Sequence, residues 1–71
     1  MKREQLLAEL RRWCRKNEVR FEIDAVSGKG SHMRVFVGTD KSTTIKSGEL
    51  ERHYVDAVLK QLGIPKRVIK R

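Results

Sequence analysis

The chain has 71 residues and a formal net charge of +8, because 17 Lys and Arg face nine Asp and Glu. A chain this short forms one small core, which excludes a second domain and a dinucleotide-binding fold. One cysteine excludes an internal disulfide framework and a multi-cysteine zinc site, and no apolar run approaches the ~18 residues of a membrane span. The positive excess predicts a polyanionic partner, and the first five residues lack the apolar stretch of a secretory signal, so we expect a cytoplasmic protein with no membrane partner.

The first predicted element is an amphipathic helix from about Arg3 to Lys16. Its apolar residues recur at three- and four-residue spacing and share one helix face: Leu6, Leu7, Leu10, Trp13 and Cys14. Four basic residues point away from that face: Arg11, Arg12, Arg15 and Lys16. The following Asn17 can adopt the left-handed conformation that ends a helix, so the helix is expected to end there.

The period then changes to two, which predicts three strands joined by turns. Apolar and polar residues alternate over 19–25 and 32–37, with a glycine-containing turn at 27–31 between them. A second turn at 38–42 leads to the β-branched segment 43–46, the third predicted strand. If one sheet face packs on helices, the open face carries Arg20, Glu22, Asp24, His32, Arg34 and Phe36.

The last predicted element is a helix capped by Ser47, with Glu49 and Glu51 in its first turn and Gly63 as its stop signal. The sequence therefore predicts an α+β fold of order α-β-β-β-α: a three-stranded antiparallel sheet with two helices on one face. We expect a single domain over residues 1–64 and a frayed basic tail over 65–71 that carries four of the positive charges. That tail is either a solubilising end or a mobile arm that adds affinity for RNA.

Few residues offer catalytic chemistry. Cys14 on the apolar helix face is expected to be a buried, inert thiol, His53 is expected to be a solvated surface residue, and no spacing predicts a metal site. His32 follows the glycine-containing turn on the open face, with Lys29 and Arg34 close in sequence. An imidazole flanked by cations suits metal-free RNA cleavage, since it can take the proton of a ribose 2′-hydroxyl while the cations stabilise charge on the phosphate.

The segment Lys29-Gly30-Ser31-His32, followed by alternating Met33-Arg34-Val35-Phe36, resembles the signature of the HicA family of toxins. Residues 46–50 and 58–64 are similar to the closing helix of that family. The resemblance implies a fold like a double-stranded RNA-binding domain and a metal-independent endoribonuclease, an mRNA interferase, that needs no cofactor. It implies that His32 is the catalytic residue.

The residues around His32 also indicate how RNA is bound. Lys29 and Arg34 are expected to hold or stabilise the phosphate, and Ser31 belongs to the same binding turn. Gly28 and Gly30 are expected to let the backbone approach the RNA closely.

The resemblance further implies an antitoxin of the HicB type that masks the active site. Arg34 and an exposed Phe36 on the open face are expected to anchor that interface. Glu22 and Asp24 on this face repel a phosphate backbone, so the RNA is expected to follow the turn and the helix ends.

Two other functions fit the same sequence. One is a non-catalytic RNA-binding module of the double-stranded RNA-binding type, although Glu49 and Glu51 replace the lysines that typically open the second helix of such domains. The other is a protein-interaction adaptor whose charge serves solubility only, which predicts no salt-dependent affinity for RNA.

Overall fold

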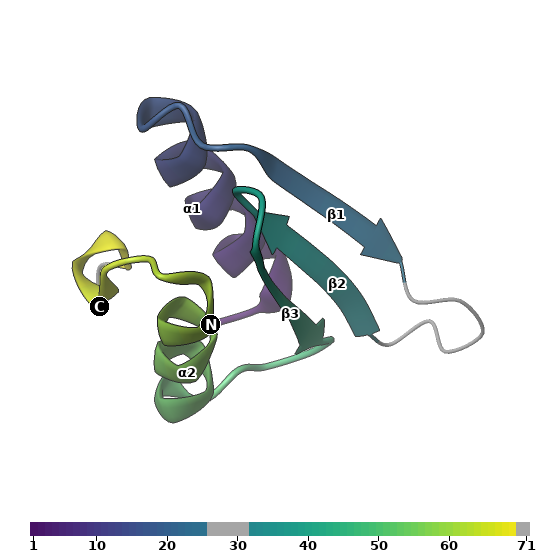
Figure 1. Cartoon of the computed structure of the whole chain (residues 1–71). Coiled ribbons are helices and arrows are strands. Elements are labelled where there is room, and N and C mark those ends of the chain that lie inside the picture. The colour runs from purple at the N-terminus through teal and green to yellow at the C-terminus, as the bar shows by residue number, and fades with distance from the viewer. Residues whose placement is uncertain (26–31, 70–71) are drawn as a thin grey trace.

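The computed structural model describes residues 1–25 and 32–69 (Figure 1). Its elements are α1 (Arg3–Lys16), β1 (Phe21–Ala25), β2 (His32–Val37), β3 (Lys41–Lys46), α2 (Arg52–Leu62) and the short 3-10 helix η1 (Lys66–Val68). The predicted α-β-β-β-α order is confirmed. No helix within the described ranges has both the length and the apolar character needed to cross a membrane.

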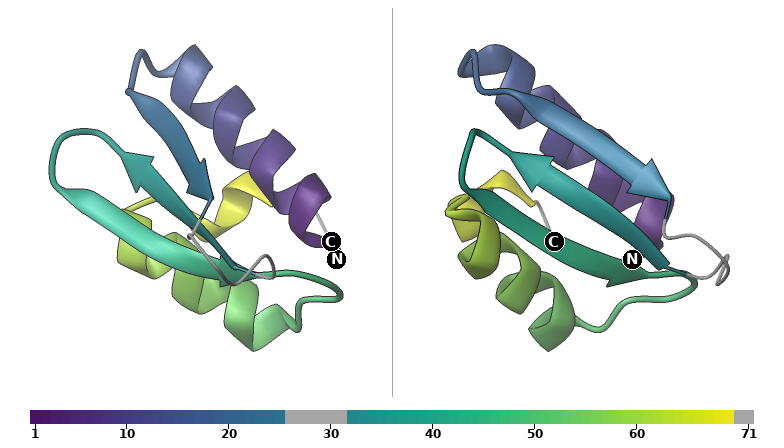
Figure 2. Two further views of the ribbon diagram at one scale, coloured as in Figure 1. Left: turned by 90° about the vertical axis from the view of Figure 1, so that its right-hand side faces the viewer. Right: turned by 45° about the vertical axis from the view of Figure 1, so that its right-hand side comes forward.

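The strands form one antiparallel sheet in the order β1-β2-β3, and both helices lie on the same face of it (Figure 2). The alternation along β2 fixes this arrangement, since Val35 and Val37 are buried against the helices while His32 and Arg34 are exposed on the other side. The core between sheet and helices consists of Leu6, Leu10, Cys14, Val35, Val37, Ile45, Leu50, Val55, Val58, Leu59, Leu62, Ile64 and Ile69.

Helix α1 has the bounds that its periodicity predicts, but its end differs from the prediction. Asn17 has a φ of −99°, and the left-handed residue is Glu18, with a φ of 56°. The amides of Glu18 and Val19 donate hydrogen bonds to the carbonyl oxygens of Arg15 and Cys14, at 3.2 and 2.8 Å. In this Schellman-type end, the left-handed residue stands one position beyond the helix cap, so the prediction for Asn17 is wrong by one residue.

Helix α2 begins five residues later than Ser47, so the predicted cap is wrong. Its cap residue is Glu51, and residues 47–50 instead lie against the N-terminus. The Leu50 amide donates to the Met1 carbonyl oxygen at 2.7 Å, and the Met1 ammonium lies 2.8 Å from the Glu49 carboxylate. Leu50, 2 % exposed, is thereby held in the core. The predicted stop at Gly63 is confirmed by its left-handed φ of 72°.

The C-terminal segment is packed rather than frayed as far as Ile69. Helix η1 contacts both α1 and α2, Val68 packs on the core, and Ile69 is only 6 % exposed. The expectation of a frayed end is therefore wrong for residues 65–69, because two adjacent apolar side chains cover the gap between the helices. Residues 70 and 71 lie outside the described residues.

Candidate functional site

His32, the candidate base, is the first residue of β2, and its exposed side chain lies on the open face of the sheet. The register places it directly opposite Lys46 of β3. The other predicted phosphate-binding residues, Lys29, Gly30 and Ser31, lie outside the described residues, as does Gly28.

Arg34 follows His32 on the same strand face and is exposed. Two residues along a strand span about 7 Å, so an imidazole and a long guanidinium side chain on one face can reach the same phosphodiester. Arg34 is paired with Asp24 of β1 and with Thr44 of β3, so these three side chains form one row across the open face. His32 and Arg34 therefore lie close together as predicted, and the acidic Asp24 lies beside Arg34 on the neighbouring strand.

Phe36 lies in the next row of the open face, between Glu22 and Ser42. It is half-buried, so the prediction of an exposed aromatic side chain is wrong. The ring lies in a hollow that is also lined by Arg20, Glu22, Gly38 and Thr39, and the Arg20 guanidinium forms an ion pair with the Glu22 carboxylate. Neighbouring strands thus cover part of the ring, and the hollow leaves the remainder open to a partner.

Tyr54 of α2 closes the outer edge of β3 beside Lys46, the register partner of His32. The Lys46 amide donates to the phenol oxygen at 3.0 Å, and the phenol donates to the Thr44 carbonyl oxygen at 3.3 Å. The Lys46 ammonium lies 5.0 Å from the centre of the Tyr54 ring. Tyr54 therefore satisfies an otherwise free strand edge and holds the Lys46 ammonium over its ring, at the outer edge of β3.

Sequence reasoning missed Lys46 as a member of this site. The predicted turn at 38–42 is centred too late, whereas the observed turn at 38–40 pairs position 32 with position 46. Because the turn ends two residues earlier than predicted, every cross-strand partner shifts by two positions, so only a correct turn assignment could have found Lys46.

Two other candidates have no catalytic environment. Cys14 is fully buried, as predicted, and burial raises the pKa of its thiol, which keeps it in the poorly nucleophilic protonated form. His53 is exposed in the first turn of α2. Within residues 1–25 and 32–69, no group of His, Cys, Asp and Glu side chains is arranged to hold a metal ion.

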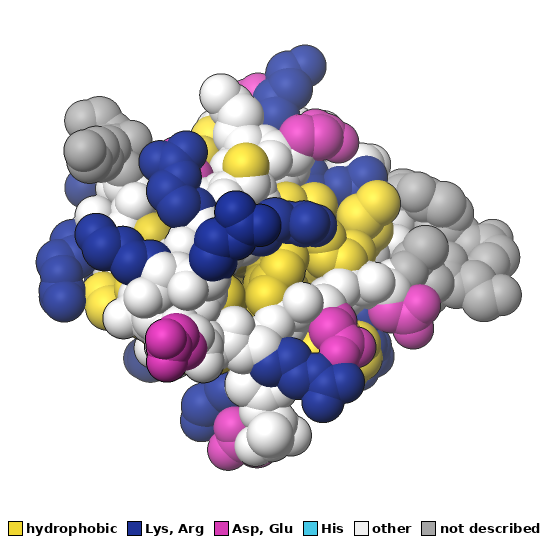
Figure 3. All heavy atoms as spheres, turned by 90° about the horizontal axis from the view of Figure 1, so that it is seen from above, with side chains coloured by type: hydrophobic (Ala, Val, Ile, Leu, Met, Phe, Trp, Pro, Cys, Tyr) yellow, Lys and Arg dark blue, Asp and Glu magenta, His cyan; other side chains and the backbone are white. Residues whose placement is uncertain are grey.

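A second surface carries more charge than the open face. Arg11, Arg12, Arg15 and Lys16 of α1 are all exposed, and Figure 3 shows Lys and Arg side chains gathered over the α1 side of the molecule. These residues were assigned by periodicity to the outer helix face, and the structure confirms that placement.

Comparison of the chain with protein-family models, with curated proteins and with solved structures finds no match. Its function must therefore be inferred from the chemistry and positions of its own residues.

Proposed function

We propose that the protein is an mRNA interferase: a metal-independent endoribonuclease that acts as the toxin of a toxin–antitoxin pair in the cytoplasm. The observation that carries this proposal is the exposed His32 at the start of β2, with Arg34 on the same face and Lys46 as its register partner on β3. The resemblance of residues 29–36 to the HicA signature supports it, and the α-β-β-β-α order fits that family's fold.

The proposed reaction needs no metal or cofactor. His32 takes the proton of a ribose 2′-hydroxyl, and the 2′-oxygen attacks the adjacent phosphorus. The bond from phosphorus to the 5′-oxygen breaks, which gives a 2′,3′-cyclic phosphate and a 5′-hydroxyl end that takes its proton from water. Arg34 stabilises the charge on the non-bridging oxygens, and Lys29, which lies outside the described residues, is expected to supply a second cation.

The same proposal includes a protein partner, an antitoxin of the HicB type that covers the open sheet face. Phe36 in its hollow and the exposed Arg34 are the anchors that this face offers. Aromatic and arginine side chains are the residues that most often dominate the energy of protein interfaces. Binding across this face covers His32 and so blocks access of RNA to it.

One observation favours the non-catalytic RNA-binding module as a second candidate. The first turn of α2 contains Arg52 and His53 and no acid, whereas the sequence predicts Glu49 and Glu51 there. Although Glu51 stands at the cap, Glu49 is occupied by the Met1 ammonium. The start of α2 is therefore less acidic than the sequence predicts, and the argument against an RNA-binding module is weaker.

The decisive experiment compares His32→Ala with His53→Ala on end-labelled RNA in EDTA. Loss of a general base lowers the cleavage rate about 10²–10⁴-fold, so His32→Ala should lose nearly all activity. His53→Ala is the matched control, because it removes the other histidine from an exposed helical position, and it should cleave like the parent.

Circular dichroism should show both variants folded. Equal cleavage by His32→Ala and the parent contradicts the proposed function. A parent that retards RNA in a gel without shortening it supports the binding module instead.

A further inference from the structure

The outer face of α1 has a charge pattern that the cleavage site does not use. Arg11 and Arg15, and likewise Arg12 and Lys16, are four residues apart and so are neighbours on the helix surface. Like charges at this spacing destabilise a helix by themselves. Of the described residues in this cluster, only Arg12 has an acidic partner, the Glu9 carboxylate at 3.7 Å. A polyanionic ligand relieves the repulsion between these cations.

Phosphates can be held along this face by several guanidinium groups. Arg11, Arg12 and Arg15 line one hollow together with Ala8. The Arg11 guanidinium lies 5.5 Å from the centre of the Phe21 ring, which holds it toward β1. Guanidinium groups on a helix surface offer paired N–H donors that match phosphate oxygens.

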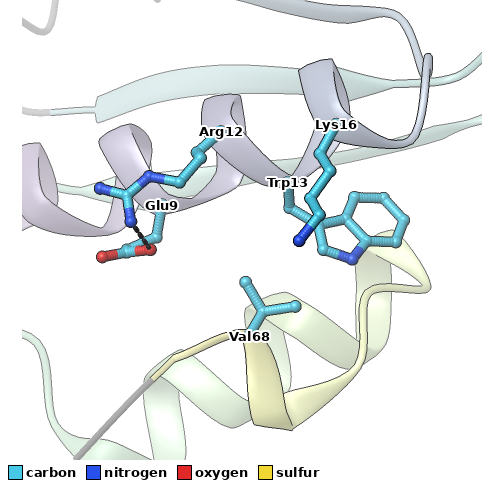
Figure 4. Close-up of a pocket in the computed structure, with 5 residues that line it drawn as sticks. All are labelled: Glu9, Arg12, Trp13, Lys16 and Val68. Carbon is cyan, nitrogen blue, oxygen red and sulfur yellow. Dashed lines mark ion pairs between the residues drawn. The ribbon is translucent and has the colours of Figure 1, made fainter.

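A second hollow, between α1 and η1, adds an aromatic surface to this row of cations. It is lined by Glu9, Arg12, Trp13, Lys16 and Val68 (Figure 4). Figure 4 shows the Trp13 indole beside the Lys16 side chain, with Val68 facing them from η1 and with Glu9 paired to Arg12. Trp13 is half-buried, so part of its ring system borders this hollow. A row of cations beside an aromatic ring is the arrangement by which proteins bind single strands, since bases stack on the ring and phosphates meet the cations.

The open sheet face is less suited to hold a nucleic-acid backbone. There Arg20 is paired with Glu22, and Asp24 stands opposite Arg34 in the register. Helix α1 lies behind the sheet, on the opposite side from the open face (Figure 2). The two surfaces are therefore separate.

We propose that the outer face of α1 is a second RNA-binding surface, distinct from the cleavage site, that takes a single-stranded segment. Its phosphates lie against Arg11, Arg12, Arg15 and Lys16, and one base stacks on Trp13. A single strand is favoured over a duplex because only an unpaired base can enter the hollow and stack there. This inference rests on the proposed function in one respect, the choice of RNA as the bound polyanion.

The test measures binding separately from cleavage, in the His32→Ala protein. Trp13 is the sole tryptophan of the chain, so its fluorescence reports directly on a base that stacks on it. We expect a single-stranded oligoribonucleotide to quench this fluorescence and to bind more tightly than the duplex of the same sequence.

The triple variant Arg12→Gln, Arg15→Gln, Lys16→Gln should weaken that binding at least tenfold at low salt. Each phosphate contact to a single strand contributes about 0.7 to the slope of log affinity against log salt, so the slope should fall by about 2. The matched control is Lys2→Gln, Lys41→Gln, Lys60→Gln, which removes three exposed cations from the N-terminal bridge, β3 and α2. The control should change the affinity by less than threefold.

Trp13→Leu keeps an apolar side chain against Val68 and removes the stacking surface. We expect it to weaken binding about fivefold or more, measured by the anisotropy of labelled RNA. If this variant unfolds, the quenching of Trp13 fluorescence in the chain that keeps Trp13 still shows whether a base stacks on the ring.

Equal effects of the two triple variants would overturn the inference, as would unchanged Trp13 fluorescence at saturating RNA or tighter binding of the duplex. Polyglutamate that binds the α1 face as tightly as RNA would also overturn it and would indicate an acidic protein partner. Binding at α1 without cleavage by the parent refutes the proposed function alone. Cleavage by the parent with unchanged RNA affinity in the α1 triple variant refutes this inference alone.

Discussion

The open sheet face and the outer face of α1 differ in how their charges are compensated. On the sheet, acidic side chains lie next to basic ones: Asp24 is opposite Arg34 in the register, and Glu22 forms an ion pair with Arg20. On α1, four exposed cations share one acid, Glu9. The positive excess behind the net charge of +8 is therefore concentrated on the outer face of α1 rather than on the open face that carries His32.

This difference in charge compensation indicates that attraction of RNA and cleavage of RNA depend on different surfaces of the molecule. Long-range attraction of a polyanion depends on uncompensated charge, which is concentrated on α1. The proposed cleavage depends on a general base within reach of one phosphodiester, and His32 on the open face is the residue proposed for that role. Substitutions on each face should therefore change different measured quantities.

The largest expected effect on stability comes from substitution of Ile69, which holds η1 against the helices. Helix η1 in turn supplies Val68 to the hollow beside Trp13. Ile69→Ala should lower the free energy of unfolding by about 2 to 5 kcal/mol, because a side chain only 6 % exposed leaves a cavity in the core. Urea unfolding measures this change. The exposed Lys66→Ala is the control, with a change within about 0.5 kcal/mol. Equal, small effects of both substitutions would mean that the C-terminal segment contributes nothing to the fold.

A smaller effect is expected when the open face is made to resemble α1. Asp24→Asn removes the acid opposite Arg34 and should raise the affinity for RNA about three- to fivefold at low salt, since one unit charge near a phosphate contributes about 1 kcal/mol. Asp40→Asn in the β2–β3 turn removes the same charge away from that row and is the control in the binding titration. If both variants gain the same affinity for RNA, the net charge of the protein rather than the position of the charge governs binding at this face.

The smallest effect concerns Glu49, which belongs to neither surface. The Met1 ammonium lowers the pKa of the Glu49 carboxyl, first by a hydrogen bond at 2.8 Å and then by its charge, with Lys2 adding to the shift. A lowered pKa in the folded state means that this stabilisation is complete above about pH 4.3, the ordinary value, and is lost as the pH falls through the folded value.

The difference in unfolding free energy between the parent and Glu49→Gln should thus be positive at pH 7 and shrink toward pH 3. It should be small throughout, because the carboxylate is 71 % exposed. A difference that does not change with pH would show that the ion pair has no part in stability.

Local periodicity was enough to predict the elements that carry both surfaces. The 3.6-residue pattern gave the bounds of α1 and the outward direction of its arginines, and the alternation in β2 gave the open face with His32 and Arg34. Each of these predictions depends only on residues a few positions apart. The antiparallel sheet and the α-β-β-β-α order followed from the short connections between such elements.

The features that were missed depend on contacts between distant residues. Ser47 has the local chemistry of a helix cap, yet the bridge between Lys2 and Glu49 and the burial of Leu50 determine the path of residues 47–50. Val68 and Ile69 are too few to form a periodic pattern, so their packing on the core had no signal in the sequence. Trp13 was correctly placed near the core, but its hollow exists only because η1 folds back beside it.

The most direct test of this division of tasks measures RNA affinity and single-turnover cleavage in EDTA for His32→Ala and for the Arg12→Gln, Arg15→Gln, Lys16→Gln triple variant. We predict that His32→Ala binds RNA like the parent and does not cleave it. We predict that the triple variant binds at least tenfold more weakly and cleaves at the parental rate when saturated with RNA. Cleavage by His32→Ala at the parental rate would contradict the account.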